Sequence, residues 1–383
     1  MKKMIALLLA LVMVLALAAC GGDDQTTGQP SDGGAAEPAP APADENKTDD
    51  APAPAEDKTE DAPEDAPAPA PSSEGLEIGV NIQEFSNAYL TDMRNGLQAT
   101  ADSMGITLDI ADGQSSEVTI SGNIDLFLTK GYEILAVNMM NTTSAPDILS
   151  KTEPAGVPVV FFNVEPEADV LAGSPTSYYV GAQAADSGTM QGEALVQYWN
   201  SNPDADRNGD GVMQYVMIQG DPGHQDSILR TEYSVKAITD AGIEVEMVAT
   251  DVANWARADG QDVMARILAA HDDIEAIICN NDEMALGAIE ALKAGGYLTN
   301  GGTFIPVVGV DCNEEAKIAI QDGTMYASVF NDAKGQADAV VKLCALIAKG
   351  ETPTSENLGY ELDGQYVWVP YIPVTIDNLN EIG

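Results

Sequence analysis

The 383-residue sequence is poor in cysteine and in basic residues, and it has none of the glycine-rich motifs that bind nucleotide phosphates. Its four cysteines show no C-x-x-C spacing, which argues against a disulfide framework. Lys and Arg number 17 against 61 Asp and Glu, a formal net charge of −44, so nucleic acid and anionic bilayer surfaces are disfavoured as partners. Neither G-x-x-x-x-G-K-S/T nor a G-x-G-x-x-G that opens a helix after a strand is present. Beyond the N-terminal segment, no apolar stretch reaches the roughly 20 residues of a membrane-spanning helix.

The first twenty residues have the three-part layout of a secretion signal. Two lysines precede an apolar run over residues 4–17, which is short for a membrane-spanning helix, and Ala18, Ala19 and Cys20 follow. The sequence LALAAC resembles the lipobox of bacterial lipoproteins, in which the signal is cut before the cysteine and the cysteine takes lipid. This resemblance implies that Cys20 is lipidated and tethers the chain to the cell membrane. The alternative is a signal that is cut by ordinary means and leaves a stray thiol.

Residues 21–75 differ in composition from the segments on either side. They hold ten of the 21 prolines and fifteen Asp and Glu against two lysines, with no aromatic residue. Such a segment cannot bury a core, and its APAP and EDAP units predict an extended, self-repelling spacer. We expect this acidic linker to hold a folded domain away from the membrane surface.

From residue 76 onward, apolar runs alternate with helical patterns. About 300 residues are enough for two domains with cores of their own. Cys279, Cys312 and Cys344 each follow an apolar run, which predicts buried free thiols. The alternation predicts an α/β protein with parallel sheets covered on both faces. The predicted strands are residues 76–82, 106–111, 133–138, 157–163, 213–218, 244–249, 276–280 and 305–311, and the predicted helices include 89–101, 125–130, 189–198, 262–270 and 284–294.

Polar and aromatic side chains stand just beyond the ends of these strands, where open α/β sheets bind ligands. The clearest case is GDPGHQDSILR at residues 220–230, where a Pro-Gly turn leads to His224, Asp226 and Arg230. Singly, each such residue has an ordinary explanation as a helix cap, a turn residue, a surface charge or a core aromatic. Together they predict a binding site, whose members are Asn87, Tyr89, Asn163, His224, Asp226, Arg230, Trp255, Asn281, Asp311 and Asn331.

The chemical character of this set suits a carbohydrate. Its amides, carboxylates and guanidinium can donate to and accept from a rim of hydroxyl groups. Its two larger aromatics, Tyr89 and Trp255, can cover the apolar C–H faces of a sugar ring.

Several motifs in order support this interpretation, namely VPVVFFN.EP, YYVG, GDPGHQD..LR, NNDEMALGA, VVGVD and NDA. With them, the chain from about residue 76 to its end resembles the galactose/glucose-binding proteins of bacterial ABC sugar uptake, which are of the periplasmic binding protein type I family. The resemblance implies two Rossmann-like lobes with parallel sheets and a three-strand hinge. It implies a monomer that closes on one monosaccharide, galactose or glucose, and delivers it to an ABC permease. All ten residues would contact the sugar, with Tyr89 and Trp255 on its two faces.

The same resemblance implies how the chain is divided. The first lobe would comprise residues 76–182 and 332–367, and the second residues 183–331 and 368–383. The chain would cross between them near residues 180–183, 330–333 and 366–370, which we expect to act as hinges when sugar bridges the lobes.

Two positions depart from the better-known members of that family. Asn87 stands where they carry an acid that bridges the epimeric hydroxyl of glucose and galactose, and an amide accepts more weakly than a carboxylate. Tyr89 stands where they carry phenylalanine, which keeps the stacking face. The departure at Asn87 leaves open which epimer binds better.

A second site is predicted at DRNGDGVMQ. Oxygen-bearing side chains fall at loop positions 1, 3, 5 and 9, with glycine at position 6 and a backbone carbonyl at position 7, as in a calcium loop of EF-hand type. These positions are Asp206, Asn208, Asp210, Val212 and Gln214. Position 12 is a methionine and cannot supply the usual glutamate, and the family resemblance implies Glu275 in its place. We expect a structural Ca²⁺ ion here, the alternative being a polar turn without metal.

Three other functions share features with this sequence. A glycosidase could use Asp226, Asp311 and His224 as acid and base, but residues that surround one small ring leave no room for a leaving group. A sugar-responsive repressor would need a basic helix-turn-helix where this chain has a signal and an acidic spacer. A sugar-sensing receptor component, or a binder of another hexose or of a pentose, stays open as an alternative.

Overall fold

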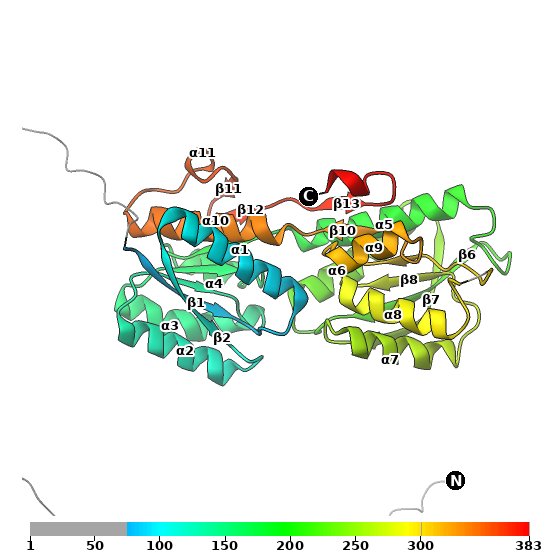
Figure 1. Ribbon diagram of the computed structural model, residues 1–383, viewed down its shortest axis with the longest axis horizontal. Coiled ribbons are helices and arrows are strands. Elements are labelled where there is room, and N and C mark those ends of the chain that lie inside the picture. The colour runs from blue at the N-terminus through cyan, green and yellow to red at the C-terminus, as the bar shows by residue number, and fades with distance from the viewer. Residues whose placement is uncertain (1–74, 300, 383) are drawn as a thin grey trace, which may run out of the picture. The chain divides into compact units, whose positions relative to one another are not determined.

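The computed structural model describes residues 75–299 and 301–382. Cys20, the signal and the acidic linker predicted above lie outside these residues. The described chain forms two lobes, each built on its own β-sheet with helices on both faces (Figure 1). No helix in this part of the chain is both long and apolar enough to cross a membrane.

The first lobe is built on a seven-stranded sheet with the order β11-β12-β5-β4-β3-β1-β2. Its strands are β1 (Glu77–Ile82), β2 (Thr107–Asp112), β3 (Leu135–Val137), β4 (Val159–Phe162), β5 (Tyr178–Gly181), β11 (Glu361–Asp363) and β12 (Tyr366–Trp368). Its helices are α1 (Ala88–Met104), α2 (Glu117–Lys130), α3 (Ala145–Ala155), α4 (Ala168–Gly173), α10 (Ala333–Ala348), α11 (Ser355–Leu358) and the 3₁₀ turn η1 (Thr142–Ser144).

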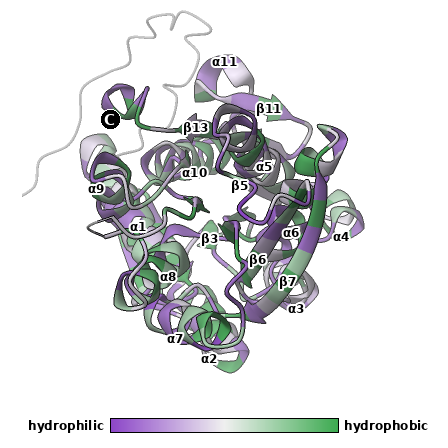
Figure 2. Cartoon of the chain, turned by 90° about the vertical axis from the view of Figure 1, so that its right-hand side faces the viewer, coloured by the Kyte–Doolittle hydropathy of each residue, from purple (hydrophilic) through white to green (hydrophobic). Residues whose placement is uncertain are grey.

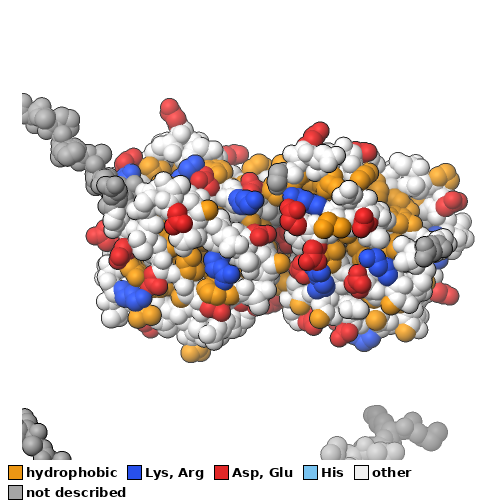
Figure 3. All heavy atoms as spheres, in the orientation of Figure 1, with side chains coloured by type: hydrophobic (Ala, Val, Ile, Leu, Met, Phe, Trp, Pro, Cys, Tyr) orange, Lys and Arg blue, Asp and Glu red, His pale blue; other side chains and the backbone are white. Residues whose placement is uncertain are grey.

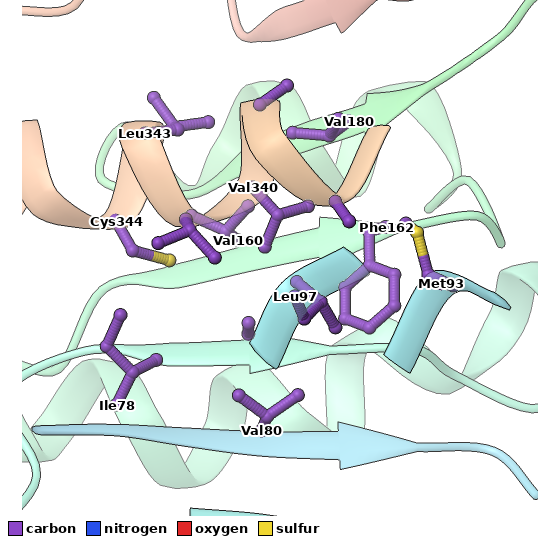
Figure 4. Close-up of a cluster of buried hydrophobic side chains, with 14 of the residues drawn as sticks. Ile78, Val80, Met93, Leu97, Val160, Phe162, Val180, Val340, Leu343 and Cys344 are labelled. Atoms are coloured by element: carbon purple, nitrogen blue, oxygen red, sulfur yellow. The ribbon is translucent and has the colours of Figure 1, made fainter. Parts of the chain in front are cut away.

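Two apolar clusters cover the two faces of this sheet. On one face, Val80 and Phe162 of the sheet pack with Leu97 of α1 and Val340 of α10, all fully buried (Figure 4). A second cluster includes Phe127 of α2 together with residues of α3 and β4. The strands are short and apolar on both sides because both of their faces lie against helices.

The second lobe is built on a four-stranded parallel sheet with the order β7-β6-β8-β9. Its strands are β6 (Val212–Gln219), β7 (Glu244–Val252), β8 (Ala276–Cys279) and β9 (Val307–Val308), beside which β10 (Ser328–Phe330) pairs with β13 (Ile372–Val374). Its helices are α5 (Ala184–Ser201), α6 (Gln225–Asp240), α7 (Arg257–Leu268), α8 (Asp282–Ala294), α9 (Glu314–Gln321) and the 3₁₀ turn η2 (Leu379–Glu381). Most of these helices carry both hydrophobic and hydrophilic residues, as expected where one side packs on a sheet (Figure 2).

The predicted fold class is confirmed with one correction, because the sheets are not parallel throughout. Strand β11 runs antiparallel to β12, and β10 runs antiparallel to β13. The reversal between β11 and β12 is made by a tight turn at Gly364, whose φ of 62° suits glycine. The prediction of buried free thiols at Cys279, Cys312 and Cys344 is also confirmed.

Three connections join the lobes. They run between β5 and α5, between β10 and α10, and between β12 and β13. They are residues 182–183, 331–332 and 369–371, at or next to the segments 180–183, 330–333 and 366–370 that the resemblance implied as crossings. All parallel strands of the first lobe therefore end on the side of the sheet from which the chain leaves for the second lobe.

Two helical glycines should respond oppositely to alanine. A Cβ on Gly287 of α8 would collide with the carbonyl oxygen of Arg257 and lie 2.7 Å from the backbone nitrogen of Gln261, both on α7. A Cβ on Gly122 of α2 would meet nothing within 4 Å. We expect Gly287→Ala to lower the free energy of unfolding by about 1–3 kcal/mol. Gly122→Ala should raise it by about 0.5–1 kcal/mol through helix propensity. Urea denaturation measures both changes, and equal effects would contradict the close approach of α7 and α8.

Candidate functional site

One cavity lies between the two lobes and takes its lining from both. It is small, and its lining is mostly polar and aromatic. A groove separates the lobes on the face shown in Figure 3, and acidic and basic side chains flank it. All ten residues predicted from the sequence line this cavity, namely Asn87, Tyr89, Asn163, His224, Asp226, Arg230, Trp255, Asn281, Asp311 and Asn331. Gln83, Glu84 and Leu90 complete the lining and were not predicted.

Three of the lining residues are helix caps as well. The Asn87 Oδ1 accepts from the Leu90 amide at the start of α1, at 3.0 Å, and the Asn281 Oδ1 accepts from the Met284 amide of α8, at 3.0 Å. His224 caps α6. These three residues therefore cap helices and line the cavity at the same time. Their helices also point N-termini, which carry partial positive charge, at the cavity.

Arg230 forms a buried ion pair with Asp226. Their side chains are only 3% and 7% exposed, and the Arg230 Nη2 donates to the Asp226 Oδ2 at 2.6 Å. The same Nη2 donates to the Tyr371 hydroxyl at 2.9 Å, Nη1 donates to the Asn280 carbonyl at 2.8 Å, and Nε donates to the Ser187 hydroxyl at 3.2 Å. Burial opposes the charge on Arg230, but Asp226, Tyr371 and Asp311 together outweigh it and raise the pKa of the guanidinium. The surface-charge alternative for Arg230 is therefore wrong.

His224 and Trp255 share one wall of the cavity. Their ring centroids are 5.2 Å apart in an edge-to-face arrangement. Burial lowers the pKa of His224, so its ring is neutral near pH 7. Because its Nδ1 accepts from the Asp226 amide at 3.1 Å, the proton sits on Nε2, which is left as a donor.

Strained backbone is concentrated at this cavity. Asn163 has a φ of 63°, Trp255 a φ of 65° and Asp311 a φ of 114°, in the region that residues other than glycine rarely adopt. Such strain persists only where the surrounding structure compensates for it, and it clusters at binding sites.

The hydrogen bonds within the lining decide which atoms remain for a ligand. Asn163 accepts through its Oδ1 from Asn138 at 3.1 Å, and Asn331 accepts through its Oδ1 from Gln336 at 2.7 Å. As in Asn87 and Asn281, the amide oxygen is thus occupied. The Nδ2 groups of Asn87 and Asn163 have no partner among the described residues and remain as donors.

Acceptors are supplied by the two carboxylates. Asp226 uses only Oδ2 for Arg230, and Asp311 uses Oδ1 to accept from the Asn331 Nδ2 at 3.3 Å. Burial raises the pKa of Asp311, and the nearby charge of Arg230 counteracts part of this rise. The cavity therefore offers unpaired donors and unpaired acceptors within one small space.

One side-chain hydrogen bond across the lobes marks a closed arrangement. The Gln225 Nε2 of the second lobe donates to the Glu165 Oε2 of the first lobe at 2.6 Å. Burial raises the pKa of Glu165 despite this bond, and the charge of Asp226 adds to the rise. Closure thus places a carboxyl group between the lobes.

The predicted calcium loop has a different environment. The Asp206 carboxylate accepts from the backbone amides of Gly209, at 2.7 Å, and Gly211, at 2.9 Å, which closes the loop. The Asn208 Nδ2 donates to the Asp210 Oδ2 at 3.0 Å and to the Gln214 Oε1 at 3.2 Å.

Glu275 comes to this loop from far along the chain. It is 3% exposed, and its Oε2 accepts from the Gln214 amide at 3.1 Å. Burial raises its pKa, and the Asp206 carboxylate adds to the rise. Across residues 75–299 and 301–382, no three His, Cys, Asp or Glu side chains converge as a metal cluster. The loop instead combines carboxylate, amide and backbone oxygens, a donor set that suits Ca²⁺ better than a transition metal.

Sequence reasoning missed the residues that hold the lining in place. Tyr371 and Asn280 bind Arg230, and the Asn280 Oδ1 also accepts from the Gly220 amide at 3.0 Å. Asn280 lies beside the predicted Asn281, and Tyr371 follows the end of β12. The strand-end pattern is the signal for both residues, because Asn280 follows β8 and Tyr371 lies just beyond β12.

Residues 78–352 match the family model of the periplasmic binding protein domain. The chain is 36% identical over 307 residues to the D-galactose/methyl-galactoside binding periplasmic protein MglB of Haemophilus influenzae, covering 79% of this chain and 91% of that protein. It is 26% identical to the ribose import binding protein RbsB of Escherichia coli, covering 69% and 84%. A solved ABC transporter solute binding protein from Bacillus halodurans with bound myo-inositol is 28% identical, with a TM-score of 0.68 and coverage of 81% and 97%.

Two ion pairs on α6 allow a matched test of the buried site. Arg230→Ala would leave the Asp226 carboxylate buried without its partner, and we expect the free energy of unfolding to fall by about 3–5 kcal/mol. Lys236 pairs with Asp240 at the same i,i+4 spacing but on the surface, so Lys236→Ala should cause no measurable change. Chemical denaturation of both variants checks this. If both variants lost a similar free energy of unfolding, the buried ion pair would contribute no more to stability than the surface pair.

Proposed function

Because this chain belongs to the periplasmic binding protein domain family, whose members bind substrates and are not enzymes, we propose that it captures galactose or glucose between its lobes. The chain is a sugar-binding, extracytoplasmic component of ABC transport. The preference for a galactose-type hexose, the closure mechanism, the lipid anchor and the metal are our proposals.

The main support is the mixed polar shell of the cavity. The Asn87, Asn163 and His224 side chains offer donors, and the Asp226 and Asp311 carboxylates offer acceptors. A sugar hydroxyl both donates and accepts, so a ring of hydroxyls can satisfy such a shell where an apolar or a purely anionic ligand would leave groups unpaired.

The aromatic side chains supply the apolar part of the site. Tyr89 projects from α1 of the first lobe and Trp255 from the second lobe, and both line the cavity. A pyranose between them would bury its C–H faces. Galactose or glucose is favoured because 36% identity links the chain to a protein named for galactose and methyl-galactoside, whereas the relative named for ribose is 26% identical.

Sugar would act by closing the lobes. A ligand that touches both lobes binds the closed form more tightly than the open one and shifts the population toward it. The contact between Gln225 and Glu165 forms only when the lobes are together. A permease could then recognise the closed form and receive the sugar from it.

The N-terminal segments suit attachment to a membrane. Cys20, at the end of LALAAC, would carry lipid, and the acidic linker over residues 21–75 would separate the binding domain from the bilayer. The protein would then act as a tethered monomer outside the cytoplasm.

A Ca²⁺ ion would be held by the side chains of Asp206, Asn208, Asp210, Gln214 and Glu275 and by the carbonyl of Val212. Their oxygens are of the hard type that Ca²⁺ prefers. The ion would neutralise carboxylates that now lie close together, which makes its role structural.

Titration calorimetry with galactose, glucose, ribose and myo-inositol tests the proposed function. We expect galactose or glucose to bind most tightly. His224→Ala removes the Nε2 donor from the cavity and should weaken that sugar by roughly 1–3 kcal/mol. His271→Ala is the control, because His271 is the other histidine of the chain and does not line the cavity. If none of these sugars bound, or if both histidine variants lost affinity alike, the proposal would fail.

Melting curves with calcium and with chelator test the metal. Asp210→Ala should lower the melting temperature more in calcium than in chelator, because in chelator only the hydrogen bonds of its carboxylate within the loop are lost. Asp204→Ala, a change at an exposed acid just before the loop, should have no calcium-dependent effect. A loss in Asp210→Ala that is equal with and without calcium would refute metal binding at this loop.

A further inference from the structure

Among the described residues, one residue of the cavity lining, Tyr89, has a fully buried polar atom without a hydrogen-bond partner. The Tyr89 hydroxyl is buried, and it forms no hydrogen bond with any described residue. The described chain has two other such atoms, the Oε1 atoms of Gln191 and Gln336, and neither residue lines the cavity. Buried hydroxyl groups in folded proteins are nearly always bonded, so this one calls for a partner from outside the chain.

The surroundings of this hydroxyl locate it at the polar end of the cavity. Burial raises the pKa of the Tyr89 hydroxyl, the nearby Tyr371, Asp311 and Asp226 add to the rise, and Arg230 opposes it. Tyr89 also lines a second, larger cavity together with Asp311 and Asn331. Tyr89 therefore borders both the ligand cavity and this neighbouring space.

Asn87 adds to the polarity of this end of α1. Its Oδ1 is occupied by the Leu90 amide, so only its Nδ2 is left to face a ligand. A tyrosine hydroxyl can donate and accept. The start of α1 thus presents one pure donor and one group that can serve either way, two residues apart.

We propose that Tyr89 is a specificity-determining residue, whose hydroxyl forms a hydrogen bond with one hydroxyl group of the bound sugar. A site that is built to bond a hydroxyl rejects an analogue without it, because a buried group is then left unpaired. The cavity accordingly selects a fully hydroxylated sugar over the one deoxy analogue that lacks this group. This proposal rests on the proposed sugar-binding function and names one determinant of its selectivity.

The test uses Tyr89→Phe, which keeps the aromatic ring and removes only the hydroxyl. Titration calorimetry compares galactose and glucose with their 1-, 2-, 3-, 4- and 6-deoxy analogues, on wild-type protein and on the variant. We expect Tyr89→Phe to weaken the parent sugar about tenfold. One deoxy analogue should bind the wild type poorly and bind the two proteins nearly alike, which identifies the bonded hydroxyl by a double-mutant cycle.

Two controls accompany this measurement. Tyr233→Phe, on α6 and outside the cavity lining, should change no affinity. The sugar-free melting temperature of Tyr89→Phe should equal or exceed that of the wild type, because the deleted hydroxyl bonds nothing in the protein. A variant that melts at the same temperature but binds the parent sugar more weakly would support a direct contact.

Unchanged affinities would overturn the proposal. If Tyr89→Phe bound every sugar within twofold of the wild type, with the same parent-to-deoxy ratios, water from the neighbouring cavity would be the partner of the hydroxyl. The proposed function would still stand, because the wild type would bind sugar. If the wild type bound no monosaccharide at all, both proposals would fail together.

Discussion

The cavity depends on one buried positive charge. Arg230 donates hydrogen bonds to the Asp226 carboxylate on α6, to the Asn280 carbonyl at the end of β8 and to the Tyr371 hydroxyl in the last lobe crossing. Guanidinium suits this position because it has five donors in one rigid plane and stays charged. Without it, the carboxylates of Asp226 and Asp311 would share a buried space without compensation. A single side chain therefore compensates the carboxylates of the site and joins three segments around them.

The cavity also shows how a doubly wound fold turns ordinary residues into a binding site. Parallel strands end on one edge, and the helices that follow begin there, so cap residues and unpaired helix amides gather at the same place. Asn87, His224 and Asn281 are caps that face the cavity for this reason. Because the cap of α1 occupies the Asn87 Oδ1, the bond that starts this helix leaves the Asn87 Nδ2 as a donor for the ligand. The Asn281 Nδ2 donates to the Trp255 carbonyl at 3.3 Å.

Much of the architecture was predictable because its signals are local. The β1, β6 and β8 strands stand out as short apolar runs, and α1 and α8 show the spacing of helices with one buried side. Helix α10 was not predicted, because it is apolar on most sides and buried against the sheet. Strands β11 to β13 were missed because each is short and partly exposed, unlike β3, which is equally short but fully buried within an apolar run.

By itself, the sequence determined which side chains follow the ends of the strands, and hence which ten residues meet at the cavity, because strand and helix periods are set over a few neighbouring residues. Only the tertiary structure decided what each of these side chains can still do. The occupied oxygen of Asn163, the protonated Nε2 of His224 and the unpartnered hydroxyl of Tyr89 depend on which groups the folded chain brings or fails to bring within hydrogen-bond distance. Such pairings arise between segments far apart in the chain, so no local pattern can specify them.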